Sequence, residues 1–330
     1  LLTDVGLSES TDSGSSNSDG ITKISTPTYV GKTEVNSTVT VVIRQGHDVL
    51  QTLSMVVTNA DGSWELTGTD ALEEGAYNWV VTATDIAGNI SDESVGEFVI
   101  DTSIDSFTAS LASDDDTGSN DDDAITNKTD VALEGSGETG AKVTLKSLTF
   151  GASSIDVSSV AVASVSNNAW SISLPSLLLG DGVYNYTVEI EDVAGNTLTT
   201  SGSLTIDTQK PTLHAALDNS ADSGSSENDE VTNVTTPTFS GQVSEASTVT
   251  LKLFKEGNLF ASYGPVTTSK DWSIVATTPL DDGEYTWTVE ATDIAGNIET
   301  YSSTLTIDTT PPTLSADALC RDSKLSIQTS

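Results

Sequence analysis

The stretch Asp293-Ile294-Ala295-Gly296-Asn297 occurs three times in this chain in nearly the same form. The other two copies are Asp85-Ile86-Ala87-Gly88-Asn89 and Asp192-Val193-Ala194-Gly195-Asn196. Each copy follows an alternating apolar run and precedes another that ends in Ile-Asp-Thr, at residues 100–102, 206–208 and 307–309. The turns are 107 and 101 residues apart, so the chain is a tandem repeat with a period of about a hundred residues.

This period divides the 330 residues into three domains of common size. We expect copy one at residues 1–102, copy two at 103–208 and copy three at 209–311. Pro312 to Ala316 repeats the start of copy three, and from about Asp317 the sequence matches nothing earlier. We therefore interpret residues 312–330 as the start of a further copy followed by a non-native or truncated tail.

The same strand signals recur in each copy at matching places. A strand that ends in glycine is followed by a strictly alternating strand, and later by a strand with tryptophan and one with tyrosine. About seven short strands with turn signals between them, and no helical periodicity, predict an all-β chain of three tandem immunoglobulin-like antiparallel β-sandwiches. The Cys…Trp…Cys signature of antibody domains is missing, so this prediction depends on strand count and alternation. We expect the tryptophans, Trp64, Trp170 and Trp272, in the cores.

Composition narrows the choice of partners. Acidic residues number 49 and basic residues 12, which gives a net charge of −37. Nucleic acid and anionic membranes would repel such a chain, whereas cations would be attracted. No apolar run reaches the ~18 residues of a membrane span, so we expect no membrane insertion, and we expect a monomer. Cys320 is the single cysteine, so disulfides do not hold these domains together. Bound metal is the usual substitute for disulfides in small extracellular domains. The alternative is an acidic protein whose charges are merely solvated.

An acidic loop rich in glycine and serine follows the first strand of every copy. Calcium takes six to eight oxygen ligands, which carboxylates and backbone carbonyls on such loops supply. The loops are not EF-hands, because the glutamate at the twelfth position is missing and Lys23 stands there in copy one. The first and last aspartates of each loop keep the same spacing, and we predict calcium ligands at Asp12 and Asp19, Asp116 and Asp123, and Asp222 and Asp229.

A second group of aspartates is expected where successive copies meet. In a seven-stranded sandwich the last strand ends at one pole, and the turn between the last two strands lies at the other. Asp101 should therefore lie near Asp192, and Asp207 near Asp293, and such carboxylates repel unless a cation bridges them. The alternative is that each turn aspartate only caps its own turn. The predicted ligands are the turn residues Asp85, Asp192 and Asp293 and the linker residues Asp101, Asp207 and Asp308, with Glu74, Asp181 and Asp282 as weaker candidates.

Nothing in the repeats favours an enzyme. His47 and His214 lie at unrelated places, and copy two has no histidine, so no repeat offers a positioned base. Gly135 to Gly140 matches a dinucleotide-binding pattern, but an alternating strand follows it in place of the required helix. We expect no enzymatic activity, although sequence alone does not exclude an acidic pair in a cleft.

The acidic loop, the Asp-x-Ala-Gly-Asn turn and the Ile-Asp-Thr linker together resemble the bacterial immunoglobulin-like repeats of giant surface adhesins, including RTX-type adhesins. The resemblance covers residues 1 to about 316. It implies calcium-rigidified extender domains, secreted and displayed on the bacterial surface, that contact adjacent repeats and hold a distal binding region away from the cell. The loop of copy two is richer in aspartate, and its linker lacks proline, which makes its ligand set harder to assign.

The sequence thus predicts a calcium-dependent spacer segment of an adhesin of the kind that serves cell adhesion and biofilms. The alternative is a glycan- or protein-binding immunoglobulin-like module of a secreted protein. That alternative predicts an exposed aromatic patch on one copy that the others lack, and the sequence offers no such patch.

Overall fold

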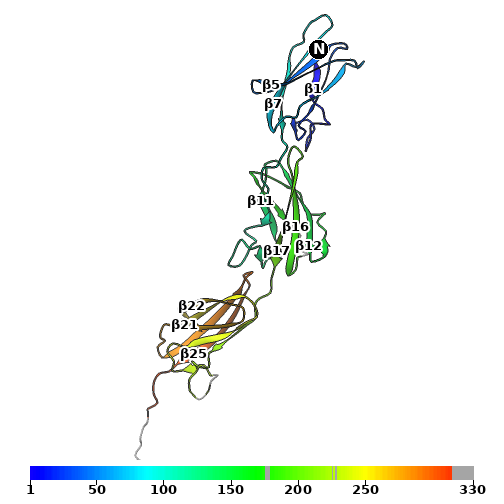
Figure 1. Ribbon diagram of the computed structural model, residues 1–330. Coiled ribbons are helices and arrows are strands. Elements are labelled where there is room, and N and C mark those ends of the chain that lie inside the picture. Colours follow the sequence, from blue (N-terminus) through cyan, green and yellow to red (C-terminus); the bar gives the residue numbers. More distant parts are fainter. Residues whose placement is uncertain (175–178, 225, 227–228, 314–330) are drawn as a thin grey trace, which may run out of the picture. The chain divides into compact units, whose positions relative to one another are not determined.

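The computed structural model describes residues 1–174, 179–224, 226 and 229–313. Every regular element in this part of the chain is a β-strand (Figure 1). The chain forms two compact units. One unit, Leu1–Thr208, holds copies one and two, and the other, which begins at Gln209, holds copy three. Within the described residues, no helix has the length and apolarity to span a membrane.

Copy one is a sandwich of two sheets. Its smaller sheet has the order β1-β3-β6, and its larger sheet has the order β2-β8-β7-β4-β5. All neighbours are antiparallel except the two-residue strand β2, which runs parallel to β8. The strands are β1 (Thr3–Leu7), β2 (Ile21–Thr22), β3 (Thr28–Lys32), β4 (Thr38–Gln45), β5 (Asp48–Val56), β6 (Ser63–Thr67), β7 (Gly75–Thr84) and β8 (Ser94–Ile100).

Copy two repeats this plan, with sheets β15-β11-β9 and β10-β17-β16-β12-β13. Strand β10 is again short and parallel to its neighbour β17, and β14 is an extra partner of β12. The strands are β9 (Ser110–Leu111), β10 (Ile125–Thr126), β11 (Ala132–Ser136), β12 (Lys142–Phe150), β13 (Ser153–Ile155), β14 (Ala163–Ser164), β15 (Ala169–Ser173), β16 (Gly182–Glu191) and β17 (Thr197–Ile206).

Copy three has sheets β18-β20-β23 and β19-β25-β24-β21-β22, again with one short parallel strand, β19, beside β25. The prediction of three antiparallel sandwiches is therefore confirmed. The strands are β18 (Leu213–Leu217), β19 (Val231–Thr232), β20 (Thr238–Val243), β21 (Ser247–Lys255), β22 (Asn258–Thr268), β23 (Asp271–Val275), β24 (Gly283–Asp293) and β25 (Ile298–Ile307).

Two features were not expected from sequence. The weakly patterned middle of each copy supplies an edge strand of the larger sheet, β5, β13 or β22. Edge strands bury only part of one face, which explains why their apolar alternation is weak. The short parallel strands β2, β10 and β19 carry too few residues to show any period. The predicted start of a fourth copy extends past residue 313 and lies largely outside the described residues.

Each core is built around a tryptophan packed over a glycine of the neighbouring strand. Trp64, Trp170 and Trp272 are buried as predicted, and their cross-strand partners are Gly31, Gly135 and Gly241. A methyl group at Gly31 would lie 2.5 Å from Cζ2 of Trp64. Sequence reasoning ended the strand at this glycine, but β3, β11 and β20 continue for one or two residues beyond it. The glycine leaves room for the indole ring in every copy, and in copies two and three it also allows a close approach of the backbone carbonyl of Thr108 or His214. Each copy has its own separate core.

We predict that Gly31→Ala destabilises copy one by about 1–3 kcal/mol, because the added methyl group overpacks a buried ring. The matched control is Gly6→Ala in the same sheet, where the new methyl group meets nothing within 4 Å and should cost little. Urea unfolding followed by tryptophan fluorescence measures both. Equal midpoints for the two variants would contradict this account of the repeated glycine.

Candidate metal centre

The acidic loop and the end of the last strand lie at the same pole of copy one. Strand β2 closes the loop and pairs with β8, and the backbone N–H of Asp101, just after β8, donates to the carbonyl of Thr22 at 2.9 Å. Copies two and three have the same bond, from Asp207 to Thr126 and from Asp308 to Thr232. The short parallel strand therefore joins both predicted groups of aspartates at one end of each sandwich.

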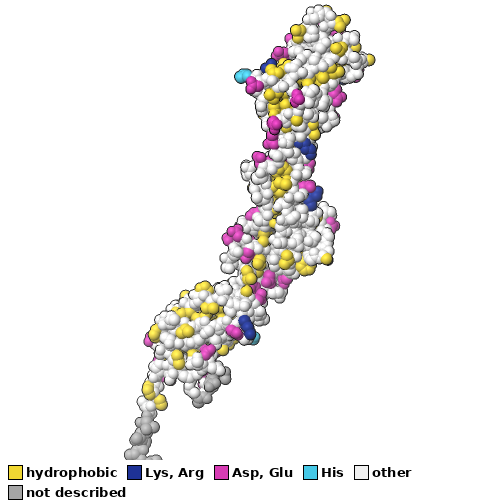
Figure 2. Space-filling view, viewed as in Figure 1, with side chains coloured by type: hydrophobic (Ala, Val, Ile, Leu, Met, Phe, Trp, Pro, Cys, Tyr) yellow, Lys and Arg dark blue, Asp and Glu magenta, His cyan; other side chains and the backbone are white. Residues whose placement is uncertain are grey.

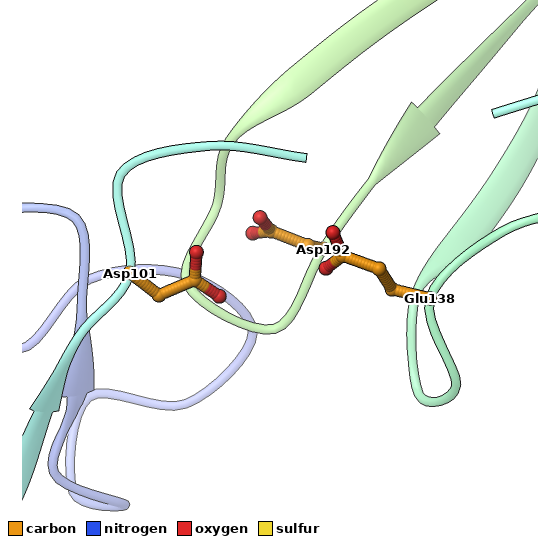
Figure 3. A group of neighbouring side chains, drawn as sticks. All are labelled: Asp101, Glu138 and Asp192. Atoms are coloured by element: carbon orange, nitrogen blue, oxygen red, sulfur yellow. The ribbon is translucent and has the colours of Figure 1, made fainter. Parts of the chain in front are cut away.

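Three carboxylates meet where copy one joins copy two. Asp101 follows β8, Asp192 follows β16, and Glu138 lies in the turn between β11 and β12. One oxygen of each lies within 4.8 Å of the others, and Figure 3 shows the three groups turned toward one another. Asp192 is 2% exposed, and the other two are partly buried. The approach of Asp101 and Asp192 agrees with the geometry expected from strand topology.

Asp192 also caps its own turn. Its Oδ1 accepts from the backbone N–H of Asn196 at 2.8 Å, and its Oδ2 accepts from Nδ2 of Asn196 at 2.8 Å. The same Nδ2 donates to the backbone carbonyl of Asp101 at 2.9 Å. The turn-capping alternative is thus correct as a description of local bonding, and the asparagine of the motif also bridges the two copies.

The junction is electrostatically unfavourable without a cation. Burial, and then the charges of Asp192 and Glu138, raise the pKa of Asp101 above its ordinary value. A cavity of about 290 Å³ beside Asp101 is lined by further acids, Glu74 and Asp105, together with Glu138. A site of converging carboxylates that is partly withdrawn from water suits a hard cation, which prefers oxygen ligands.

Direct contacts also join the two copies. Ser13 Oγ donates to the carbonyl of Ala194 at 2.7 Å, and the N–H of Ser15 donates to the carbonyl of Val193 at 3.2 Å. A side chain at Gly14 would begin 2.0 Å from the Val193 carbonyl oxygen. The glycine of the acidic loop therefore allows a close approach by the backbone of the next copy.

In each acidic loop, one buried carboxylate oxygen has no hydrogen-bond partner among the residues that the structure describes. Within the described residues, Oδ1 of Asp12, Asp116 and Asp222 is buried and accepts no hydrogen bond. Asp12 and Asp222 are only 4% and 7% exposed. Buried polar atoms are nearly always satisfied, so an orphan oxygen at the same position of three repeats calls for a partner. These three residues were all predicted ligands.

The second oxygen of this carboxylate, Oδ2, accepts a hydrogen bond in copies one and two. Asp12 Oδ2 accepts from the N–H of Gly20 at 3.1 Å, and Asp116 Oδ2 accepts from Ala124 at 3.0 Å. Burial raises the pKa of Asp12 and of Asp116, and the charges of Asp19 and Asp123 add to the rise. The loop is therefore preorganised around an unfavourably placed negative charge.

The last aspartate of each loop has a simpler local role. Oδ1 of Asp19 accepts from the backbone N–H two residues later, at 3.0 Å. The other two copies have the same bond at 3.1 Å, from Ile125 to Asp123 and from Val231 to Asp229. Each of these residues caps its turn and still has a second oxygen at the loop.

Of the remaining predicted ligands, Asp85 and Asp308 accept hydrogen bonds from nearby residues, and Asp207 and Asp293 stay predictions. Asp85 accepts from the N–H and Nδ2 of Asn89 in its own turn, and these bonds lower its pKa. It belongs to no cluster of three acids among the described residues. Asp308 Oδ1 accepts from the N–H of Thr310 at 3.0 Å. Asp207 and Asp293 belong to different compact units, so their expected meeting stays a prediction.

The weaker candidates, Glu74, Asp181 and Asp282, accept hydrogen bonds from the linkers. Glu74 Oε2 accepts from the hydroxyls of Thr102 and Ser103, at 3.1 and 2.8 Å. Asp181 and Asp282 accept from the backbone and hydroxyl of Thr208 and Thr309 in the same way. These acids hold the first residues after the last strand of their own copy and so stiffen the start of each linker.

Sequence reasoning missed Glu138. A signal was present, because Glu34 and Glu138 each stand three residues after the glycine that lies under the tryptophan, and Glu245 stands four after. A glutamate is common in a polar turn, so only its position against Asp101 and Asp192 distinguishes Glu138. Ser13 and Lys23, which contact the next copy, were missed for the same reason.

The chain belongs to the family described as bacterial Ig-like domain, which it matches over residues 2–102, 103–208 and 209–309. No curated protein sequence matches the chain. Among solved structures, it is similar to a tetra-tandem repeat in the extending region of a large adhesion protein, with 24% identity, a TM-score of 0.29, and 86% of this chain and 71% of that chain covered.

Two ice-binding adhesin structures are also similar. One concerns host cell surface retention of a 1.5-MDa bacterial ice-binding adhesin, with 20% identity, a TM-score of 0.39 and 93% and 97% of the two chains covered. The other is a Ca²⁺-stabilised adhesin with which an Antarctic bacterium binds ice, with 22% identity, a TM-score of 0.33 and 93% and 73% covered. Similarity at this level does not assign a function to this chain.

We predict that Asp101→Asn raises the melting temperature of the metal-free chain at pH 7.5, because asparagine removes a repelled charge and keeps an oxygen acceptor. The raised pKa means that the folded chain binds a proton more tightly than the unfolded chain. Wild-type stability from this group is therefore present at low pH and lost as pH rises through the raised pKa.

The difference in melting temperature between Asp101→Asn and wild type, both in EDTA, should accordingly shrink as pH falls from 7.5 toward 4. The comparison cancels the contributions of other acids, which are common to both chains. A difference that stays constant over this range would contradict the assignment of charge repulsion to Asp101.

Proposed function

We propose that this chain is a spacer segment of a bacterial surface adhesin, stiffened by calcium at the junctions between its immunoglobulin-like repeats. The carboxylate cluster of Asp101, Glu138 and Asp192 carries the proposal. Its members come from two repeats, so an ion held by all three would fix one repeat against the next. The motif combination shared with adhesin extender repeats supports the biological setting, which is secretion to the cell surface as a monomeric chain.

Calcium suits this cluster better than other common cations. Three carboxylates on separate turns impose no strict octahedral geometry, and calcium tolerates irregular sets of oxygen ligands, whereas magnesium does not. When bound, the ion would supply the positive charge that cancels repulsion among Asp101, Glu138 and Asp192. The backbone bonds from the turn caps would keep these side chains in place.

The acidic loops are the second proposed class of calcium site. Asp12, Asp116 and Asp222 each have a buried oxygen that lacks a partner among the described residues, which a cation would satisfy. Asp19, Asp123 and Asp229 would contribute their second oxygen. The loop of copy one also contacts copy two through Ser13 and Ser15, so order in the loop supports the junction.

We extend the proposal to the second junction by sequence equivalence. Asp207 corresponds to Asp101, Asp293 to Asp192, and Glu245 lies in the turn that corresponds to the one with Glu138. Asp85 and Asp308 would serve junctions with further repeats, because they occupy the same places at the two ends of the array. The division at residues 102, 208 and 311 is part of this proposal.

Extracellular calcium modules typically bind with dissociation constants of roughly 10⁻⁴ to 10⁻³ M. At a hundredfold excess of free calcium over that constant, each site adds about 2.7 kcal/mol. Two such sites per repeat would equal a large part of the stability of a small domain. The metal would therefore control both the stability of each repeat and the stiffness of the chain.

We predict that millimolar calcium raises the melting temperature well above its value in EDTA, and that equal magnesium has a much smaller effect. Small-angle scattering should show a longer maximum dimension in calcium. Asp12→Asn and Asp101→Asn should each reduce the calcium-induced rise, whereas Asp61→Asn, on an exposed turn away from both sites, should leave it unchanged. No calcium shift in the wild-type chain would reject the spacer proposal.

The ligand-binding alternative gains little support. It predicts exposed aromatic side chains on one copy alone. Phe150 in copy two is 45% exposed, but Phe260 and Tyr301 in copy three are exposed to 40% and 37%. No single copy is distinguished, so we do not propose a glycan- or protein-binding site. We likewise assign no catalytic residue.

A further inference from the structure

Lys23, a basic residue of copy one, contacts copy two at their junction. Nζ of Lys23 donates to the backbone carbonyl of Gly195 at 2.5 Å. The N–H of Lys23 donates to Ser13 Oγ at 2.9 Å, and that hydroxyl donates to the carbonyl of Ala194. Lysine and serine of copy one thus hold two successive carbonyls of the Asp-x-Ala-Gly-Asn turn of copy two.

The backbone around Lys23 allows this reach. Lys23 directly follows β2, whose pairing with β8 fixes the end of the acidic loop. Gly14 and Gly195 both have positive φ and pack so closely that a side chain on Gly195 would begin 3.0 Å from the Cα of Gly14. The turn of copy two therefore lies against the loop of copy one, within range of the lysine.

The charge of Lys23 is unusual for its position. The chain has 12 basic and 49 acidic residues, and the acids at this junction include Asp101, Glu138 and Asp192. A charged donor makes a stronger hydrogen bond than a neutral one. An ammonium group also brings positive charge to a negative junction, and a chelator does not remove it.

The other copies have no lysine at the position of Lys23. Copy two has Lys128 one residue later, and its Nζ donates to the Asp114 carbonyl and to Asp115 of its own loop. Lys23 lies eleven residues after Asp12, and the residues at the same offset from Asp116 and Asp222 are Asn127 and Asn233. Their backbone N–H groups donate to Thr117 Oγ1 and Ser223 Oγ, at 2.9 and 2.8 Å, just as that of Lys23 donates to Ser13. The backbone position is the same in all three copies, and only the side chain differs.

We propose that Lys23 is a calcium-independent tether that keeps copies one and two docked when calcium is absent. A junction with asparagine in this place, as in copy two, depends on the metal to a greater degree. By sequence equivalence, with Asn127 in the place of Lys23, we expect the second junction to respond more strongly to calcium than the first. This inference rests on the proposed spacer function and names how its first junction is regulated.

The test is a spin-label distance measurement across the first junction in the full chain. The labels go on Thr52→Cys and Thr199→Cys, two exposed strand positions in copies one and two, with Cys320→Ser to remove the native thiol. In EDTA we expect a narrow distance distribution for wild type and for Lys23→Arg. For Lys23→Met we expect the undocked fraction to rise about tenfold or more, the usual effect of losing a hydrogen bond to a charged group.

The matched control is Lys146→Met, which removes the same charge from an exposed ion pair with Glu189 on copy two. It should leave the distribution narrow. A narrow distance distribution for Lys23→Met in EDTA would overturn the inference. So would a wild-type distribution in EDTA that is as broad as that of Lys23→Met. Failure of calcium to narrow the Lys23→Met distribution would instead count against calcium at the junction and leave the tether standing.

If Lys23→Met lowers the melting temperature of copy one in EDTA, a broad distance distribution could reflect damage to copy one. A gain-of-function variant then tests the tether. Asn127→Lys, with labels on Thr199→Cys and Thr267→Cys, should narrow the distances across the second junction in EDTA. In that case an unchanged distribution for Asn127→Lys would overturn the inference. A merely structural role for Lys23 within copy one would not give order to a different junction.

Discussion

Carboxylates held close together repel one another, and the end of copy one places Asp101 within 4.8 Å of two carboxylates of copy two. The fold leaves them little freedom to separate. Asp101 is fixed by the pairing of β8 with β2, and Asp192 is fixed by the cap that it forms on its own turn. The architecture of the repeats thus creates a concentration of negative charge at the joint, and everything proposed about stiffness depends on how that charge is balanced.

The acidic loop of copy one makes contacts both within its own repeat and with the next repeat. Asp12 accepts a hydrogen bond from Gly20 within its own repeat, and its other oxygen has no partner among the described residues, whereas Ser13 and Gly14 contact the turn of the next repeat. Asp12, Ser13 and Gly14 are consecutive, so an ion bound at Asp12, as proposed, would also order the surface on which copy two docks. This adjacency gives a physical route by which a site inside one repeat can affect the orientation of the next.

The acidic side chains of each sandwich lie outside its apolar core. The tryptophan–glycine pairs and the alternating strands supply separate apolar cores, and acidic side chains are spread over the visible surface with few basic ones (Figure 2). Glu74, Asp181 and Asp282, each just before a strand, accept hydrogen bonds from the first linker residues of their own copy. The repeats can therefore differ in loop and junction residues, as at Lys23 and Asn127, without a change of fold.

The repeat, the sandwich architecture and the recurring aspartates could all be predicted from the sequence, because they depend on period, alternation and fixed local spacing. The sequence could not reveal Glu138 as the third member of the cluster, the buried oxygen of Asp12, or the docking of Gly14 on Val193. Each of these is a property of contacts between distant or differently buried groups. Only the tertiary structure fixes which turns share a pole and how closely two backbones approach, and so only it decided which acids meet.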